Sequence, residues 1–522
     1  MLNRRQFLGS AAAGMTGTST ALAAVQKKEI DLVIVGGGLG GLAAANAAVN
    51  KGVKPLVLEK LQFLGGAGLF PEGSLGVNTR YQKEHGIKTT VQQVLDAALQ
   101  YHHYRCDPAV LRVLIEESQR TIDEIQDMGV EFRGIRTMYD KSESLMTWHL
   151  FKGGAAEVIR RFIDNIKARG GEILTQTTAQ KLVVENGAVC GVEAVNAKGD
   201  KLIIRAKKVI IATGGFAANK EMLAQHVFDS SALGMVEPIW LRGPVVDGRT
   251  GDGIKMAQLV GAGVAGNAPY LPDVPPINQF SGPDELKQGR CALAQPWLWV
   301  DHTGRRFFNE SRGSVFVDVY NAMTSAGGVL YTIFDQEKMD RMIQKGAVLP
   351  FNAIVLADVP LKALPKTWEI GRERGWAFKA DTIEELAQKI KAHPENKDRM
   401  VPANLVETVK RFNGFCEKKK DEDFGKAERN LAKKIEKGPF WACYTGMTVH
   451  HTMGGIKIDS KTQVYNTKGQ IIPGLFAAGE ITGGVHGGNR LGGNAQADIV
   501  TFGRIAGQQA YIFAKQQDAA KK

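Results

Sequence analysis

A glycine-rich turn between an apolar strand and an alanine-rich helix constrains the fold of this chain more than any other feature. The apolar run Leu32–Val35 indicates a buried parallel strand, and Gly36, Gly38 and Gly41 follow it with the spacing G-x-G-x-x-G. Glycines at these places allow a tight turn, close approach of a pyrophosphate, and a helix packed against the strand. The pyrophosphate would then lie at the positive end of the helix. The pattern predicts a dinucleotide-binding α/β fold.

An acidic residue follows the next apolar strand. Residues Leu56–Leu58 form that strand, and Glu59 stands at its end. A carboxylate there can accept hydrogen bonds from both hydroxyls of an adenosine ribose, and it would repel a 2′-phosphate. Glu59 therefore favours FAD or NAD over NADP as the cofactor.

The length of 522 residues exceeds what one hydrophobic core supports, so two or more domains are expected. A hydrophobic fraction of 44% with 60 glycines is typical of a soluble α/β protein rich in turns. The sequence contains no run of about 18 apolar residues, so no membrane span is predicted.

The N-terminus carries paired basic residues before an apolar run. Arg4 and Arg5 precede Phe7 and Leu8, and the run to Ala24 ends in small residues. This segment resembles a twin-arginine export signal with its cleavage site, and the alternative is a disordered basic tail. We therefore expect residues 1–24 to be a signal peptide and the mature protein to be periplasmic.

Removal of that segment lowers the formal net charge from +12 to about +10, because Arg4 and Arg5 are its only charged residues. A basic surface can attract anionic substrates or an acidic redox partner. The lysine-rich stretches 418–420 and 433–434 contain no interleaved aromatic residues, so no nucleic-acid binding is predicted.

The five cysteines show neither a CxxC nor a CxxCH pattern. The sequence therefore predicts no metal site, no c-type haem and no iron–sulfur cluster. If the chain binds a flavin, its electrons must come from another protein, for which a c-type cytochrome or a flavin carrier is the expected donor.

The remaining pattern suggests one domain interrupted by another. Residues 90–129 have helical periodicity broken at Asp107-Pro108, which predicts a helical hairpin. Residues 181–212 contain short strand-like segments, among them Leu202–Ile204 and a separate buried run at Val209–Ile211. A segment rich in proline and glycine, 267–295, suggests a crossing between domains. We expect a first cofactor-binding part over 28–270, an inserted cap over 271–449 and a second cofactor-binding part over 450–516.

The C-terminal block carries the most specific motifs. They are Val449–Gly455, Pro473–Glu480 and Gly484–Asn494, and they are joined by Thr213–Phe216, Thr250–Gly253 and Arg306–Glu310. With these motifs, residues 29–515 resemble the flavoprotein subunits of the fumarate reductase and succinate dehydrogenase family, most closely the soluble periplasmic fumarate reductases. The resemblance implies a Rossmann-like FAD-binding domain with an inserted α+β capping domain.

The resemblance also implies cofactor contacts. Glu480 would hold the ribitol hydroxyls of FAD, and the helix that begins at Asn494-Ala495 would direct its N-terminus at the flavin N1/O2 edge and stabilise the reduced flavin. The complete set assigned to the cofactor is Gly36, Gly38, Gly41, Glu59, Lys60, Gly66, Ala67, Thr213, Gly214, Asp252, His451, Gly479, Glu480, Arg490, Asn494 and Ala495. The loop Leu61–Leu69 lacks the histidine that attaches flavin covalently in membrane-bound relatives, so the FAD should be noncovalent.

His450 and Arg490 match the residues that grip a substrate carboxylate, and Thr452 is assigned to substrate binding with them. An arginine offers a bidentate fork to a carboxylate and a histidine a further donor. The alternatives are a structural histidine for His450 and a surface ion pair for Arg490.

The other half of the family site is altered. In the family, a cap arginine protonates the carbon beside the one that receives hydride from flavin N5, and Ser314 stands at its place here. The relay positions, expected to be Glu and Arg, fall near Arg290 and Leu293, and residues 270–279 lack the His-Pro-Thr that supports a second carboxylate. Arg312 is the expected substitute donor, unless it is an ordinary surface arginine. Tyr320 and Arg290 are weaker candidates.

These observations predict an exported FAD-dependent reductase acting on the C=C bond of an α,β-unsaturated carboxylate of the fumarate, methacrylate or acrylate, urocanate or cinnamate type. One alternative is a dehydrogenase of ketosteroid type. Another is a flavin electron-transfer subunit without catalysis of its own.

Overall fold

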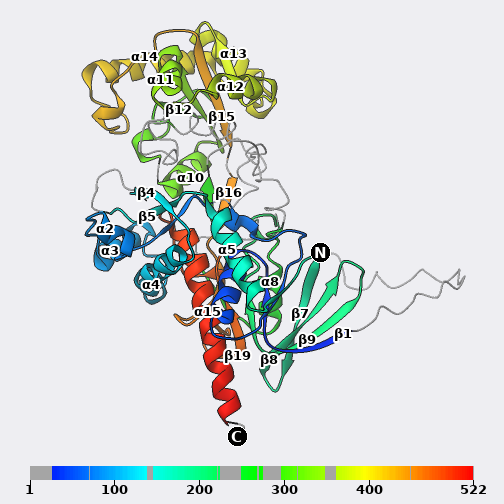
Figure 1. The fold of residues 1–522 in the computed structure, drawn as a ribbon. Helices are drawn as coiled ribbons and strands as arrows, with labels where there is room; N and C mark the ends of the chain where they lie inside the picture. Colours follow the sequence, from blue (N-terminus) through cyan, green and yellow to red (C-terminus); the bar gives the residue numbers. More distant parts are fainter. Residues whose placement is uncertain are drawn as a thin grey trace, which may run out of the picture.

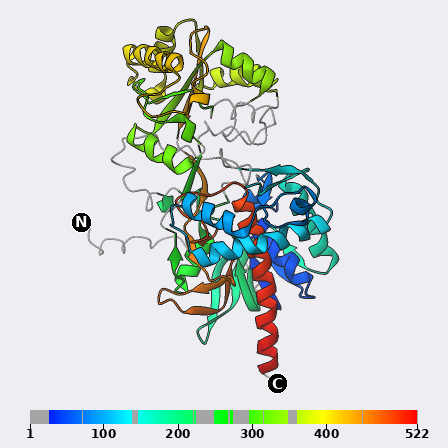
Figure 2. The same ribbon diagram turned by 90° about the vertical axis from the view of Figure 1, so that its left-hand side faces the viewer.

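The computed structural model describes residues 26–69, 71–137, 145–219, 221–223, 248–266, 270–273, 295–313, 315–346, 360–446 and 448–520. Two bodies are visible in both views (Figure 1 and Figure 2). We call the larger one, with residues 26–266 and 455–520, the main body, and the smaller one, with residues 295–446, the cap. The predicted signal peptide, residues 1–24, lies outside the described residues.

A mixed sheet forms the centre of the main body. Its strand order is β18-β19-β9-β1-β2-β6, and β7 and β8 extend it from β9. The central pairs β1 with β2, β1 with β9 and β9 with β19 are parallel. Parallel strands covered on both faces are apolar throughout, which explains the run Leu32–Val35. The bounds are β1 Gln26–Val35, β2 Leu56–Leu58, β6 Glu172–Leu174, β7 Thr177–Glu185, β8 Ala188–Asn196, β9 Lys201–Ile211, β18 Gln463–Tyr465 and β19 Ile471–Ala477.

One strand is longer than the sequence pattern suggested. We expected Leu202–Ile204 and Val209–Ile211 to be separate segments, but both belong to β9. The polar residues between them continue the ladder with β1, which runs from Gln26↔Leu202 to Val35↔Ile211. The backbone hydrogen bonds to β1 therefore keep β9 continuous, although the polar side chains between its two apolar runs suggested a break.

Small residues let two helices pack closely beside this sheet. Helix α1, Leu39–Val49, is buried along its whole length, and α15, Asn494–Ala520, lies against it (Figure 1). A Cβ at Gly507 would lie 2.2 Å from the carbonyl oxygen of Ala44, so only glycine fits that contact. Helix α5, Ala155–Ala168, also packs against α1. In the described part of the chain, no helix has both the length and the apolar character needed to cross a membrane.

The predicted helical hairpin is confirmed as α3, Val91–Tyr101, and α4, Pro108–Asp127. The Asp107 side chain caps α4 by accepting a hydrogen bond of 2.9 Å from the N–H of Ala109, and Pro108 occupies the first turn. Further short elements of the main body have the bounds η1 Gly66–Leu69, β3 Gly73–Leu75, α2 Arg80–Glu84, β4 Phe132–Arg136 and β5 Trp148–Phe151.

The cap has an antiparallel sheet and a hydrophobic core of its own. Its strand order is β12-β13-β15-β14, and aromatic residues such as Trp368 and Phe334 fill the core. Helix α10, Phe316–Ser325, lies between this sheet and the main body (Figure 1). The other bounds are β12 Leu298–Val300, η2 Glu310–Arg312, β13 Val329–Asp335, α11 Gln336–Lys345, α12 Leu364–Glu373, β14 Ala377–Ala380, α13 Ile383–Lys391, η3 Pro394–Asn396, α14 Pro402–Lys418, η4 Glu428–Asn430 and β15 Phe440–Gly446.

A two-stranded ribbon joins cap and main body. Strand β11, Tyr270–Asp273, pairs antiparallel with β16, Thr448–Thr452, and Tyr270 stands opposite Thr452. Both predicted domain boundaries, after residues 270 and 449, fall within this ribbon. The ribbon leads into elements of the main body with the bounds α8 Asp252–Leu259, β10 Val264–Ala265, β17 Gly455–Lys457 and β20 Thr482–Gly483.

Candidate active site

The predicted glycine turn connects β1 to α1, and its conformation requires glycine. Gly36 has φ 109°, and a Cβ there would lie 2.4 Å from the carbonyl oxygen of Ala212. A Cβ at Gly41 would lie 1.9 Å from the Gly36 carbonyl oxygen, so Gly41 serves the packing of helix on turn. Gly38 is the N-cap of α1 and brings no side chain to the helix N-terminus. The positive end of α1 therefore faces the turn, as a pyrophosphate site requires.

Glu59 is held by backbone groups at the end of β2. The N–H of Gly37 donates to its Oε2 at 2.7 Å, and the N–H of Leu61 donates to its Oε1 at 2.8 Å. Burial raises the pKa of Glu59, against the opposing effect of these two hydrogen bonds. The carboxylate is thus fixed at the carboxyl edge of the parallel sheet, where a ribose would be recognised.

Lys60 reaches across to the start of α8. Its Nζ donates to Asp252 Oδ2 at 2.7 Å and to Thr250 Oγ1 at 2.8 Å. Burial alone would raise the pKa of Asp252, but the hydrogen bonds from Lys60 and Thr250 outweigh burial and lower it. Lys60 and Asp252, both predicted to bind the cofactor, therefore form an ion pair with each other at the start of α8.

Glu480 is paired with an arginine that the sequence analysis did not single out. Arg249 Nη1 donates to Glu480 Oε1 at 3.2 Å, and both side chains are only 6% exposed. Glu480 Oε1 also accepts from the N–H and the hydroxyl of Thr452, each at 3.0 Å. The hydroxyl proton of Thr452 is therefore directed at Glu480, and its contact with a substrate stays a prediction.

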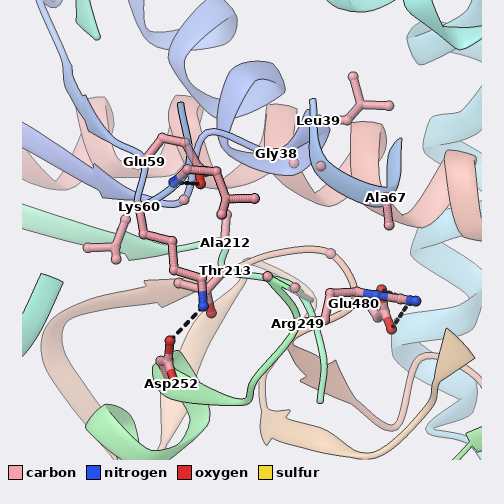
Figure 3. Close-up of a pocket in the computed structure, with 18 of the residues that line it drawn as sticks. Gly38, Leu39, Glu59, Lys60, Ala67, Ala212, Thr213, Arg249, Asp252 and Glu480 are labelled. Carbon is pink, nitrogen blue, oxygen red and sulfur yellow. Dashed lines mark hydrogen bonds and ion pairs between the residues drawn. The ribbon is translucent and has the colours of Figure 1, made fainter. Parts of the chain in front are cut away.

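These groups line one pocket (Figure 3). Figure 3 shows the Lys60–Asp252 pair on the left, below Glu59, and the Arg249–Glu480 pair on the right, below Ala67. The predicted cofactor residues that line it are Gly36, Gly38, Glu59, Lys60, Gly66, Ala67, Thr213, Gly214, Asp252, Gly479 and Glu480. The predicted residues outside this lining are Gly41, His451, Arg490, Asn494 and Ala495.

A second buried polar group surrounds the start of α15. His486 Nε2 lies 3.2 Å from Asp498 Oδ2, and the His486 ring centroid lies 5.5 Å from that of His451 and 5.8 Å from that of His102. Burial lowers the pKa of His486 and of His102, and it raises the pKa of Asp498 to about 8. The His486–Asp498 pair is therefore neutral near pH 7. One ligand atom each of His451, His486 and Asp498 lies within 4.8 Å of the others, but a cation there would have to displace the proton of Asp498.

Arg490 is buried in the loop before α15. Its Nη1 donates to the carbonyl of Leu491 at 2.9 Å, and its backbone N–H donates to Asn489 Oδ1 at 3.0 Å. The side chain is 7% exposed, so the surface ion pair considered as its alternative is excluded. The backbone of His450 lies in β16, and its side chain is outside the described residues.

Several buried polar atoms near these residues suit a polar ligand. Within the described residues, the side-chain nitrogens of His102, both polar atoms of Asn494 and of Gln496, and the hydroxyl of Thr213 have no hydrogen-bond partner in the protein. Buried polar groups are nearly always paired, so this concentration at the start of α15 indicates a bound group with donors and acceptors. A flavin ring, with its alternating N–H and carbonyl edge, fits such a surface.

Arg312, the expected proton donor, lies at the edge of the cap. It forms an ion pair with Asp318 of α10, and the side chains are 58% and 21% exposed. Ser314, Arg290, Leu293 and residues 274–279 are outside the described residues, as is the side chain of Tyr320.

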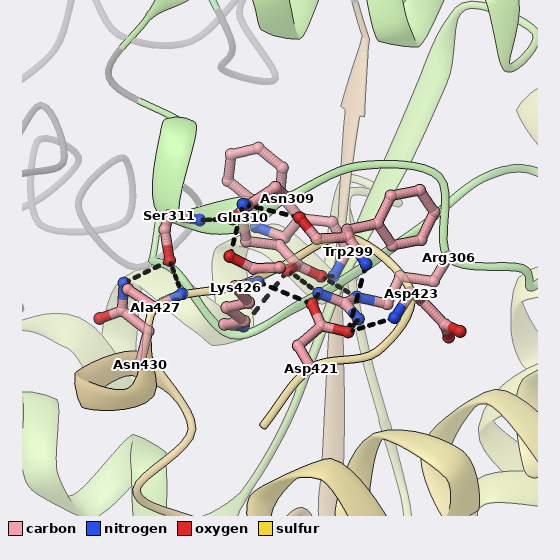
Figure 4. Close-up of polar contacts among 12 residues, drawn as sticks. Trp299, Arg306, Asn309, Glu310, Ser311, Asp421, Asp423, Lys426, Ala427 and Asn430 are labelled. Carbon is pink, nitrogen blue, oxygen red and sulfur yellow. Dashed lines mark hydrogen bonds and ion pairs between the residues drawn. The ribbon is translucent and has the colours of Figure 1, made fainter. Parts of the chain in front are cut away.

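The motif Arg306–Glu310 lies in the cap, where it forms a buried ionic network (Figure 4). Arg306 Nη2 donates to Glu310 Oε2 and to Asp421 Oδ2, both at 2.7 Å. Lys426 Nζ lies 3.4 Å from Glu310 Oε2, and the N–H of Trp299 donates to Glu310 Oε1 at 3.1 Å. The motif therefore stabilises the cap.

Comparisons with known proteins agree with this fold and pocket. A family model described as FAD binding domain matches residues 31–495. The vinyl phenol reductase of Lactiplantibacillus plantarum is 31% identical and covers 93% of this chain and 97% of its own. The NADH:fumarate oxidoreductase of Klebsiella pneumoniae is 30% identical over 96% of this chain, which spans only 50% of that relative. The open conformation of a flavocytochrome c3 fumarate reductase has a TM-score of 0.70 at 27% identity, and the match covers 93% of this chain and 79% of that one. The α/β fold class and the family resemblance predicted from the motifs are confirmed.

Proposed function

This chain belongs to the family of FAD-binding oxidoreductases that includes the fumarate reductase flavoproteins, and we propose that it reduces the C=C bond of an α,β-unsaturated carboxylate. FAD is its cofactor. The observation that carries the proposal is Arg490, a buried guanidinium held by its own loop beside the polar groups that suit a flavin. An arginine offers a bidentate fork to a carboxylate, which is the role that the family motif assigns to Arg490.

In the proposed reaction, Arg490 and His450 hold the substrate carboxylate and thereby fix the double bond in one orientation. The bound flavin supplies the hydride. Glu59, Lys60, Arg249 and Glu480 hold the cofactor through its ribose, phosphate and ribitol parts. The proton that completes the reduction comes from Arg312 at the edge of the cap. In the family the donor arginine stands at the position that Ser314 occupies here.

The substrate is proposed to be of the fumarate, methacrylate or acrylate, urocanate or cinnamate type. The changed second half of the site, with Ser314 at the usual donor position, supports a substrate with one essential carboxylate. A separate c-type cytochrome or flavin protein is proposed as the electron donor, since the cysteines form no CxxCH or CxxC pattern.

Two rival functions remain. A neutral substrate of ketosteroid or vinyl phenol type offers no carboxylate for the grip assigned to His450 and Arg490. A pure electron-transfer role would make no use of a carboxylate grip. Both rivals therefore explain less of the site than an unsaturated acid does.

The test is dye-linked reduction of a panel of substrates. Reduced dye should be oxidised when fumarate, methacrylate, acrylate, urocanate, cinnamate or itaconate is added, and one of these acids should be preferred. Matched methyl esters, 4-vinylphenol and a steroid enone serve as controls and should be poor substrates. Equal rates with a neutral analogue would refute the proposed role of the carboxylate, and no reduction of any acid would refute the function.

The FAD should be released when the purified protein is precipitated by acid. The pocket contacts are hydrogen bonds and ion pairs, and the loop Leu61–Leu69 contains no histidine for a covalent bond. The measurement is the absorbance of the supernatant near the flavin bands, with chromatography to identify FAD. Yellow colour retained in the pellet would show a covalent link.

We propose periplasmic localisation through the twin-arginine route, on the basis of Arg4 and Arg5 before Phe7-Leu8. Changing both arginines to lysine should leave an unprocessed precursor in the cytoplasm. Fractionation and immunoblotting of cells check this, and normal maturation of the double variant would contradict it.

A further inference from the structure

Residues 421–430 of the cap, which we call the anchor segment, are folded around one buried carboxylate. Asp421 Oδ1 accepts a hydrogen bond of 3.0 Å from the N–H of Asp423, and its Oδ2 accepts one of 2.9 Å from the N–H of Lys426. The same carboxylate is bound by Arg306, whose Nη1 and Nη2 lie 2.9 and 2.7 Å from its two oxygens. Asp421 therefore fixes the anchor segment against the strand-to-turn connection that begins at Arg306.

The anchor segment also binds the residue directly before Arg312 (Figure 4). Ser311 Oγ accepts a hydrogen bond of 3.0 Å from the N–H of Ala427 and one of 2.8 Å from Asn430 Nδ2. Ser311 and Arg312 are neighbours in the short helix η2. The two hydrogen bonds to Ser311 therefore fix the backbone from which the Arg312 side chain extends.

The start of η2 is bound to the same segment. Asn309 Nδ2 donates to the carbonyls of Phe424 and Gly425, at 2.9 and 3.1 Å. Its Oδ1 accepts a hydrogen bond of 3.0 Å from the N–H of Ser311, so the same amide caps η2. Side chains on both sides of Glu310 thus connect η2 to the anchor segment.

Arg312 needs such support because packing does not hold its side chain. The side chain is 58% exposed, and an arginine has many rotamers that solvent leaves accessible. Its guanidinium is bound to Asp318 of α10, with Nε 3.0 Å from Oδ2. The position of the guanidinium is therefore set at two places, by the backbone of η2 and by the carboxylate of Asp318.

Building on the proposed function, we infer that the anchor segment positions Arg312 as the proton donor through the hydroxyl of Ser311. Arg312 gives an N–H proton to the carbon beside the one that receives the hydride, and its neutral guanidine regains a proton from solvent. A donor displaced by about 1 Å can lose 10²-fold in rate, so a backbone contact far from the reacting atoms affects catalysis. Ser311 is thus a positioning residue.

The test is Ser311→Ala, with Ser311→Thr as the variant that keeps the hydroxyl. With the acid preferred in the panel, Ser311→Ala should lower kcat by roughly 10- to 10²-fold, and Ser311→Thr should recover most of the loss. The KM, the affinity for the saturated acid as an inhibitor, and the FAD content should stay unchanged. Arg312→Ala should likewise lower kcat and leave inhibitor affinity unchanged.

Thr382→Ala is the matched control in the cap. The hydroxyl of Thr382 also accepts a hydrogen bond from a backbone N–H, that of Glu385 at 3.1 Å, but it caps α13 and does not contact η2. This variant should lose a similar amount of stability in urea and keep the wild-type kcat.

The ratio of kcat in H2O to kcat in D2O gives a second measurement. Ser311→Ala should raise this ratio, because transfer of the proton becomes slower when its donor is misplaced. A variant that is only less stable should keep the wild-type ratio, as we expect for Thr382→Ala.

An unchanged kcat in Ser311→Ala would overturn the inference, and an impaired Arg312→Ala would show that the proposed function stands without it. An equal fall of kcat in Ser311→Ala and Thr382→Ala would also overturn it, because a general loosening of the cap would explain both. If Ser311→Ala does not fold, Asn430→Ala decides, since it removes one of the two donors to Ser311: a lowered kcat with a raised isotope ratio supports the inference, and unchanged values overturn it. If the wild type reduces none of the acids, the proposed function fails and the inference falls with it.

Discussion

Replacing Arg490 by alanine should lower kcat/KM for the unsaturated acid by some tens to thousands of fold. Truncating one partner of a buried, hydrogen-bonded charge pair costs about 2 to 5 kcal/mol, and each 1.36 kcal/mol corresponds to roughly tenfold in rate. The Arg490 side chain is 7% exposed, so water cannot readily replace the lost contact. Steady-state kinetics with the preferred acid, together with binding of the saturated acid, measure the effect.

Two further variants make this result specific. Arg490→Lys keeps the charge but not the bidentate fork, so it should recover only part of the loss. Ser314→Ala should change kcat/KM little, because a serine hydroxyl is not an effective acid near neutral pH. Full activity of Arg490→Ala, with FAD still bound, would contradict the assignment of the carboxylate grip.

The sequence predicted those parts of the cofactor pocket whose residues are close together in the chain. The turn at Gly36 and the carboxylate of Glu59 belong to one strand–helix–strand unit, and the packing contacts that demand glycine arise within that unit. The start of α4 could be predicted in the same way, because its cap Asp107 and the first-turn residue Pro108 are next to each other in the chain. Local chemistry of this kind leaves a pattern with fixed spacing.

Contacts between distant segments left no such pattern. Arg249 meets Glu480 across 231 residues, and nothing about a single arginine before Thr250 identifies its partner. The neutral pair of His486 and Asp498 depends on burial, which a sequence motif does not report. The hydrogen bond from Thr452 to Glu480 was also missed, because the two residues are 28 positions apart in the chain.

Replacing Glu310 by alanine should destabilise the cap by about 3 to 5 kcal/mol, the usual cost of removing one member of a buried ion pair. Arg306 would keep only the carboxylate of Asp421, Lys426 would lose the carboxylate 3.4 Å from its Nζ, and the N–H of Trp299 would lose its acceptor. Urea denaturation followed by tryptophan fluorescence measures the loss. FAD content should fall less, because the pocket belongs to the main body. As a control, Glu369→Ala removes an exposed pair with Arg372 and should cost only about 0.2 to 1 kcal/mol.

The pH dependence of the Glu310→Ala defect follows from Lys426. Burial lowers the pKa of Lys426 to about 8, and the charge of Glu310 opposes this effect. In the unfolded chain the pKa of Lys426 is about 10.4, so between about pH 8 and about pH 10.4 the unfolded state binds more protons than the folded state. The contribution of Lys426 to the free energy of unfolding therefore rises with pH in this range. Without Glu310 the pKa of Lys426 in the folded state falls further, so its contribution to the free energy of unfolding begins to rise at a lower pH. The difference in stability between wild type and variant should therefore be larger at pH 6 than at pH 9, because at pH 9 Lys426 has largely lost its proton in both folded proteins. A defect that grows with pH would show that the charge of Lys426 does not depend on Glu310.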